Sequence, residues 1–291
     1  MSEWYSSTGG LQNSAMPEGG WIPKGRSLFQ VLSVKARLNN AGSDQIRAYG
    51  TIHIFDATGD IYHEIYNRTS DDGQDMCIGD GADPSGGGDL IASPTQAVSA
   101  NSHVSIIAYL KARVGASNSP GGSTNLVEKS IAEGSIEWDA LANSDVNIYD
   151  EIESERILGP DGFVDVDFIV MSSATEAAIR IFAVDAHNEH EPYLLDIHGT
   201  ITADFSIYKD SRLSLKQNGE IPLTRSTIAI PRTDESLEIF LNLTWNHNPS
   251  ASSRDPETIN GKARFMSAFK ASSSQDIAGK HGSFRVEVTW M

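Results

Sequence analysis

The chain has 291 residues, of which 39% are hydrophobic and 21% charged, and its formal net charge is -17. This apolar content is enough for a folded core and excludes general disorder. The excess of acidic residues excludes sequence-independent binding to the phosphate backbone of nucleic acids.

The N-terminal segment, residues 1–26, is rich in Gly, Ser and Pro and holds the isolated aromatic residues Trp4, Tyr5 and Trp21. This composition predicts a flexible arm. Its aromatic side chains suit packing on the body of the protein or on a second copy of the chain. We therefore expect that any homo-oligomer would form through this arm.

Apolar and polar residues alternate in several runs of the first half, which predicts β-strands. The runs cover residues 30–38, 46–55, 61–66, 104–114 and 127–138. Between them lie an irregular stretch at 67–89 and a loop at 116–124, and an acidic connector follows at 139–160.

The second half shows the same strand pattern, with turn residues between the runs. The predicted strands lie near residues 163–170, 175–184, 194–205, 211–215, 227–231, 237–245 and 285–290. No segment has helical periodicity for more than about two turns. Short helices fit only residues 123–130 and 143–156.

The two halves repeat one another in order. Gly50-Thr51-Ile52 matches Gly199-Thr200-Ile201, and Gly88-Asp89-Leu90 matches Gly219-Glu220-Ile221. We expect strands that end in Trp138 and Trp290 to close the two copies at corresponding points. The sequence therefore predicts an all-β fold of two tandem, related antiparallel β-sandwich units with only short helices. We assign residues 1–26 to the arm, 27–160 to the first unit and 161–291 to the second.

Six aspartates of the irregular stretch form the best candidate ligand-binding site. A glycine-rich loop can fold several carboxylates around one Ca²⁺, which takes six to eight oxygen ligands. The spacing does not match an EF-hand, so a solvated acidic loop is the alternative. The candidate residues are Asp71, Asp72, Asp75, Asp80, Asp83 and Asp89. We expect no cofactor other than this possible calcium ion.

Exposed aromatic residues suggest a second kind of site, because their rings stack on the apolar face of a pyranose. Core or edge packing is the alternative for each of them. The candidates for such a glycan platform are Trp4, Tyr5, Trp21, Tyr62, Tyr66, Tyr149, Tyr193 and Tyr208.

Catalytic signatures are weak, and we predict no catalytic residue. No Gly-x-Ser-x-Gly, His-Glu-x-x-His or Walker-type motif is present. Two Glu–Arg pairs, Glu153 with Arg156 and Glu176 with Arg180, are similar to the signature of ribosome-inactivating N-glycosidases, in which Glu and Arg lie one helical turn apart. The second pair is spaced too widely and lies in a predicted strand.

Localisation is predicted from what the sequence does not contain. No basic segment followed by an apolar one stands at the N-terminus, and no apolar run approaches the roughly 18 residues of a spanning helix. The single cysteine, Cys77, cannot form a disulfide within the chain, which is typical of a reducing compartment. We expect a cytoplasmic protein without an integral membrane segment.

The order of several motifs resembles a plant domain of unknown function that is expanded in grasses. The motifs are Ile197–Ala203, Ser211–Leu215, Ile221–Ser226, Phe284–Trp290 and Ile65–Asp72. That domain also forms the C-terminal part of the sixty-kilodalton jasmonate-induced protein of cereals. The resemblance covers residues 27–291 and implies a role in plant stress or defence, but it supplies no catalytic residues.

These observations favour a non-enzymatic binding or interaction module in plant stress or defence, with an unknown protein or a glycan as its ligand. A calcium-dependent glycan- or membrane-binding module, a ribosome-inactivating-type enzyme and a self-assembling structural protein are the alternatives.

Overall fold

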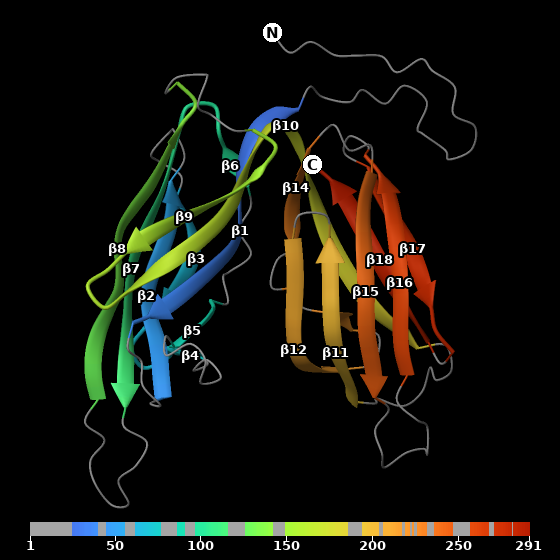
Figure 1. Cartoon of the computed structure of the whole chain (residues 1–291). Coiled ribbons are helices and arrows are strands. Elements are labelled where there is room, and N and C mark those ends of the chain that lie inside the picture. The colour runs from blue at the N-terminus through green and yellow to red at the C-terminus, as the bar shows by residue number, and fades with distance from the viewer. Residues whose placement is uncertain are drawn as a thin grey trace, which may run out of the picture. The chain divides into compact units, whose positions relative to one another are not determined.

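The computed structural model describes sixteen segments of the chain, and the N-terminal arm up to residue 24 lies outside them. The described segments are residues 25–39, 45–55, 62–76, 86–90, 97–115, 126–141, 149–185, 194–203, 206–216, 219–221, 223, 226–231, 236–246, 257–267, 271–280 and 282–291. Two compact units are present (Figure 1). The first unit is Ser27–Ser172, and the second is Ser173–Met291 together with Arg26.

The described residues are all-β, as the sequence predicts, and their strands pair antiparallel. The first unit contains β1 (Arg26–Leu38), β2 (Gln45–Phe55), β3 (Tyr62–Arg68), β4 (Gln74–Met76), β5 (Gly86–Asp89), β6 (Val98–Ser99), β7 (His103–Gly115), β8 (Leu126–Asp139), β9 (Ile152–Leu158) and the first part of β10 (Gly162–Asp185). One sheet, the β2–β7 sheet, has the order β3-β2-β7-β8, with β4 beside β2. In the other, the β1–β10 sheet, β1 lies between β10 and the short strands β5 and β6, and β9 pairs with β10.

The second unit is built from the rest of β10 and eight further strands. These are β11 (Leu194–Ala203), β12 (Ser206–Lys216), β13 (Glu220–Ile221), β14 (Thr227–Pro231), β15 (Ser236–Asn246), β16 (Glu257–Met266), β17 (Ser272–Ala278) and β18 (Gly282–Trp290). One sheet has the order β12-β11-β15-β16. In the other, β10 pairs with β13, β14 and β18, and β18 pairs with β17.

The two units repeat one topology, strand for strand. The orders β3-β2-β7-β8 and β12-β11-β15-β16 correspond, and so do the pairs β9–β10 and β17–β18. The registers agree as well, because Gly50 lies opposite Leu110 and Gly199 lies opposite Leu243. The predicted match of Gly50-Thr51-Ile52 with Gly199-Thr200-Ile201 therefore falls on equivalent strands.

Three details of the sequence prediction are wrong. Residues 126–130 and 152–156, which fit the two short helices, lie in β8 and β9, and the described residues contain no helix. For residues 127–130 the overlapping prediction of a strand over 127–138 is confirmed. Both segments pair along their length with neighbouring strands, and this long-range pairing overrides a weak local preference. The tryptophans are not equivalent, since Trp138 lies on β8, the counterpart of β16, whereas Trp290 lies on β18.

Because no helix is described, none can cross a membrane in this part of the chain.

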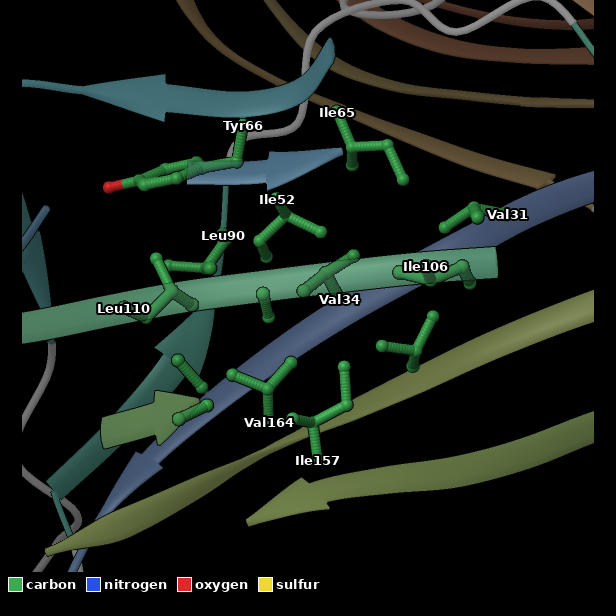
Figure 2. Close-up of a cluster of buried hydrophobic side chains, with 14 of the residues drawn as sticks. Val31, Val34, Ile52, Ile65, Tyr66, Leu90, Ile106, Leu110, Ile157 and Val164 are labelled. Carbon is green, nitrogen blue, oxygen red and sulfur yellow. The ribbon is translucent and has the colours of Figure 1, made fainter. Parts of the chain in front are cut away.

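The core of the first unit lies between its two sheets (Figure 2). Ile52, Ile106 and Leu110 of the β2–β7 sheet join Val34 and Val164 of the β1–β10 sheet in one buried cluster. Each such side chain stabilises the fold by about 2 kcal/mol when it leaves water. A second cluster fills the second unit and includes Ile239, Leu241 and Phe284.

Gly50 is required where β2 meets β7. Its φ angle is +121°, a conformation that side chains of L-residues rarely adopt, and an added Cβ would lie 2.1 Å from the carbonyl oxygen of Tyr109. Backbone cannot move aside as a flexible side chain can, so the two strands need a glycine at this point.

We expect Gly50→Ala to lower the free energy of unfolding by about 3 kcal/mol, from backbone strain and the clash with β7. Chemical denaturation followed by circular dichroism measures the change. Gly73→Ala is a useful comparison, because its nearest backbone contact of 2.9 Å is longer and its φ angle is not positive. Equal stability of Gly50→Ala and the wild type would contradict the assigned pairing of β2 with β7.

Candidate functional site

Four of the six aspartates predicted to bind calcium lie in the described residues, and three of these pair with arginines. Asp71, Asp72 and Asp75 lie 3.5, 3.0 and 3.1 Å from Arg113, Arg68 and Arg47. Asp89 lies on β5 opposite Lys35, whose pKa is raised by a hydrogen bond to Asp167 and further by the Asp89 charge. Asp80 and Asp83 lie outside the described residues.

Among the described residues, no three His, Cys, Asp or Glu side chains lie close enough together to hold a metal ion. The arginine partners supply the positive charge that an ion would otherwise bring to Asp71, Asp72 and Asp75. Calcium binding by the complete loop stays a prediction of the sequence.

The most developed arrangement of functional groups is the outer face of the β2–β7 sheet. The inward residues Ile46, Ala48, Ile52 and Ile54 of β2 are buried, so the alternate residues point outward. Pairing of β2 with β7 and of β7 with β8 arranges the outward residues in rows across three strands. We call this set the outer face: Arg47, Tyr49, Thr51, His53, Phe55, Ile107, Tyr109, Lys111, Arg113, Glu128, Glu133, Ser135 and Glu137.

A hydrogen-bonded cluster occupies one part of the outer face. The Tyr49 hydroxyl donates to Glu128, and Lys111 Nζ donates to Glu128 Oε1 over 2.7 Å. The guanidinium carbon of Arg113 lies 5.7 Å from the centre of the Tyr49 ring, within cation–π range. Arg113 also donates to the carbonyl oxygen of Ser70 over 3.1 Å. These contacts hold four side chains in fixed positions on an exposed surface.

The charges of this cluster suit hydrogen bonding. Burial and the bond to Glu128 raise the pKa of Tyr49 to about 12, so its hydroxyl keeps its proton at neutral pH. Hydrogen bonds from Lys111 and Tyr49 lower the pKa of Glu128, which stays ionised. A tyrosine and a glutamate shifted in these directions serve as a fixed donor and a fixed acceptor, and they are poorly matched to proton transfer near neutral pH.

Tyr109 is the exposed ring of this face. Its side chain is 56% exposed, and it lies on β7 between Thr51 of β2 and Glu133 of β8. The rings of His53 and Phe55 extend the aromatic surface along β2, with centres 6.5 Å apart and planes at 76°. The outer face therefore combines an open ring with ordered donors and acceptors beside it.

The structure describes the side chains of two of the eight residues named for the aromatic platform, Tyr66 and Tyr149, and both take part in packing. Tyr66 is buried, and its hydroxyl donates to the carbonyl oxygen of Ala48 over 3.0 Å. Tyr149 packs edge-on against Trp138 with ring centres 5.8 Å apart. Trp4, Tyr5, Trp21 and Tyr193 lie outside the described residues, as do the side chains of Tyr62 and Tyr208.

The four main residues of the outer face, Tyr49, Tyr109, Lys111 and Glu128, were missed in the sequence. The alternation of β2 indicates that Tyr49 points away from the face formed by Ile46, Ala48 and Ile52, and this was the one feature of the sequence that could have identified it. Only the register between strands, however, brings Tyr49, Lys111 and Glu128 together.

The Glu–Arg pairs compared with ribosome-inactivating enzymes lie in strands, where a helical turn cannot align them. Glu153 and Arg156 are three apart on β9, so they point to opposite faces. Glu176 and Arg180 on β10 bond separately, to Arg26 and Glu220. The helical geometry of that signature is therefore absent from both pairs.

The pKa of Tyr49 predicts a loss of stability at alkaline pH. Because the folded value, about 12, exceeds the ordinary value of 10.0, the contribution is complete below pH 10 and is lost as the pH rises to 12. We expect about 1 kcal/mol, after allowing for solvent screening. Ultraviolet titration after a rapid pH jump should show a late tyrosine ionisation that Tyr49→Phe removes. An unchanged titration curve in Tyr49→Phe would argue against the bond to Glu128.

One family model spans nearly the whole chain. The family described as "Domain of unknown function (DUF6598)" matches residues 28–288. No curated protein matches the sequence.

Solved structures give only distant likenesses. A structure of human GIVD cytosolic phospholipase A2 with methyl gamma-linolenyl fluorophosphonate inhibitor and terbium chloride has 5% identity and a TM-score of 0.23, over 92% of this chain and 33% of that chain. A second structure of that enzyme with the fluorophosphonate has 9% identity and a TM-score of 0.21, over 92% and 33%. A structure of extended-synaptotagmin 2, holding its SMP domain and a pair of C2 domains, has 8% identity and a TM-score of 0.24, over 90% and 57%. This chain spans about a third of the phospholipase chains and just over half of the synaptotagmin chain, and the low TM-scores carry no argument.

Proposed function

The chain belongs to the DUF6598 family, and from that premise we propose that it is a non-enzymatic binding module whose ligand lies on the outer face of the β2–β7 sheet. The observation that carries the proposal is the open ring of Tyr109, 56% exposed, beside the ordered groups of Tyr49, Lys111 and Glu128. Exposed aromatic residues among fixed polar groups are typical of recognition surfaces.

The ligand class that fits this face is an uncharged glycan. A pyranose offers an apolar face that stacks on a ring such as Tyr109, and hydroxyl groups at its edge that accept from Lys111 and donate to Glu128. An extended sheet face also suits an extended chain of sugars.

The charges of the face favour an uncharged ligand over an ionic one. Arg47, Lys111 and Arg113 already pair with Asp75, Glu128 and Asp71. A charged ligand would have to compete with these pairs, whereas a hydroxyl group can add to an ion pair and leave it intact. This argument selects neutral oligosaccharides over phosphorylated or sulfated ligands.

The biological setting that we propose is a plant stress or defence response in the cytoplasm. The resemblance of the sequence to the grass-expanded domain supports the first part, and the single cysteine of the chain supports the second.

Binding to neutral oligosaccharides tests the proposal. We expect an open face to bind a sugar chain weakly, with a dissociation constant on the order of 0.1–1 mM, and Tyr109→Ala to weaken it about tenfold. Isothermal titration calorimetry of the full chain against a panel of neutral oligosaccharides, chosen from a glycan array, measures both values.

Asn242→Ala is the matched control, because Asn242 is the exposed residue of β15 at the position equivalent to Tyr109 on β7. We expect this variant to bind as the wild type does. The proposal fails if no neutral oligosaccharide binds, or if Tyr109→Ala binds as tightly as Asn242→Ala does. A substrate screen that shows robust turnover would overturn the non-enzymatic assignment.

A further inference from the structure

Two equivalent hairpins close the β1–β10 sheet and its counterpart in the second unit. β9 and β10 join through Gly159–Gly162, and β17 and β18 join through Gly279–Gly282. In both turns the first glycine donates to the carbonyl oxygen of the last, over 2.9 and 2.7 Å. Ile157 and Ile277, two residues before each turn, are both buried. The two hairpins therefore have strands of the same length, paired in the same register.

At one equivalent pair of facing residues, each hairpin has an ion pair between Arg and Asp. The arginine lies on the first strand of the hairpin in the first unit and on the second strand in the second unit. Arg156 of β9 lies opposite Asp165 of β10, whereas Asp276 of β17 lies opposite Arg285 of β18. Both pairs are bidentate and use the same atoms. The Nε–Oδ1 and Nη2–Oδ2 distances are 2.6 and 3.1 Å in the first unit and 2.8 and 3.0 Å in the second.

The opposite orientation of the two ion pairs disfavours strand exchange, in which the edge strand of one unit pairs with a strand of the other unit. If β9 paired with β18 in the native register, Arg156 would face Arg285, and if β17 paired with β10, Asp276 would face Asp165. Each exchange would replace an attractive pair by a repulsive one. The other charged residues of the two ladders do not discriminate. Asp167 and Glu287 are both acidic and lie opposite Ser154 and Ser274, and Glu153 and Glu155 lie opposite uncharged residues and would do so after exchange as well.

Tandem copies of one fold are prone to this error, because each offers the other a strand of matching shape. The buried Ile157 and Ile277, the facing strands' Val166 and Val286, and the turn glycines are alike in both hairpins, so these positions cannot prevent exchange. We infer that the reversed ion pairs Arg156–Asp165 and Asp276–Arg285 direct each edge strand to its own unit during folding, by making exchanged pairings repulsive.

A charge reversal within one hairpin tests the inference without breaking its ion pair. Arg156→Asp with Asp165→Arg gives both hairpins the same orientation, so exchange is no longer repulsive. Each charged cross-strand pair changes a pairing equilibrium by a factor of about two. In the double variant, two exchanged pairs lose their repulsion and become attractive. We therefore expect the ratio of exchanged to native pairing after refolding to rise about tenfold.

The readouts are the yield of native monomer after refolding from denaturant and a disulfide reporter of exchange. Ser154→Cys with Glu287→Cys, in a Cys77→Ser background, places the two thiols opposite each other when β9 pairs with β18. In the native ladder these positions lie opposite Asp167 and Ser274. We expect little disulfide crosslinking in the cysteine-bearing protein with the native ion pairs. Adding Arg156→Asp and Asp165→Arg to that protein should increase the crosslinking.

Reversing both hairpins is the control that separates partner selection from local damage. The quadruple variant adds Asp276→Arg and Arg285→Asp, which restores opposite orientations, so its monomer yield and crosslinking should return to those of the wild type. A double variant that refolds like the wild type would overturn the inference. So would a quadruple variant that refolds as poorly as the double one, because the loss would then come from local damage.

Discussion

Burial of one face of the β2–β7 sheet is the constraint on which the candidate site depends. Ile46, Ala48, Ile52 and Ile54 are held against the β1–β10 sheet by the hydrophobic effect, and because side chains alternate along a strand, this fixes Tyr49, Thr51 and His53 on the outside. Pairing with β7 then fixes which residue stands beside which. A shift of one residue in this register would bury Tyr109 and expose Ala108 and Leu110, so the core and the outer face specify each other.

Charge pairing explains why the acidic loop and the outer face differ in the chemistry they offer. The chain is strongly acidic, yet three of its arginines lie beside the aspartates at 71, 72 and 75, and lysine and tyrosine converge on Glu128. Carboxylates with such partners have part of their charge balanced by the protein itself. What remains at the surface is a set of oriented donors and acceptors around an exposed ring, which is suited to a polar ligand without charge.

Local pattern was enough to predict the all-β class and the phase of β2, because alternation over a whole strand is a strong signal. It was not enough where the answer depended on partners far away in the sequence. Residues 152–156, which the sequence assigns to a connector, become a strand by pairing with β10. The candidate site was missed for the same reason, since Tyr49 and Glu128 are brought together only across three strands. The aspartates attracted attention because they cluster in sequence, whereas Arg47 and Arg113, which pair with Asp75 and Asp71, lie on strands distant in sequence.

Comparison of equivalent positions shows which features the two units share and where they differ. Glycine occupies equivalent places at Gly134 and Gly261, opposite Ala108 and Leu241, and Ile157 and Ile277 pack near them. The positions equivalent to the outer face differ, because His198 and Asn242 stand where Tyr49 and Tyr109 stand in the first unit. Packing constrains the inward residues of both units alike, whereas exposed residues are not constrained by the core and can differ between the units. The ring and the hydrogen-bonded cluster belong to the first unit, so duplication of the fold does not entail duplication of the proposed binding function.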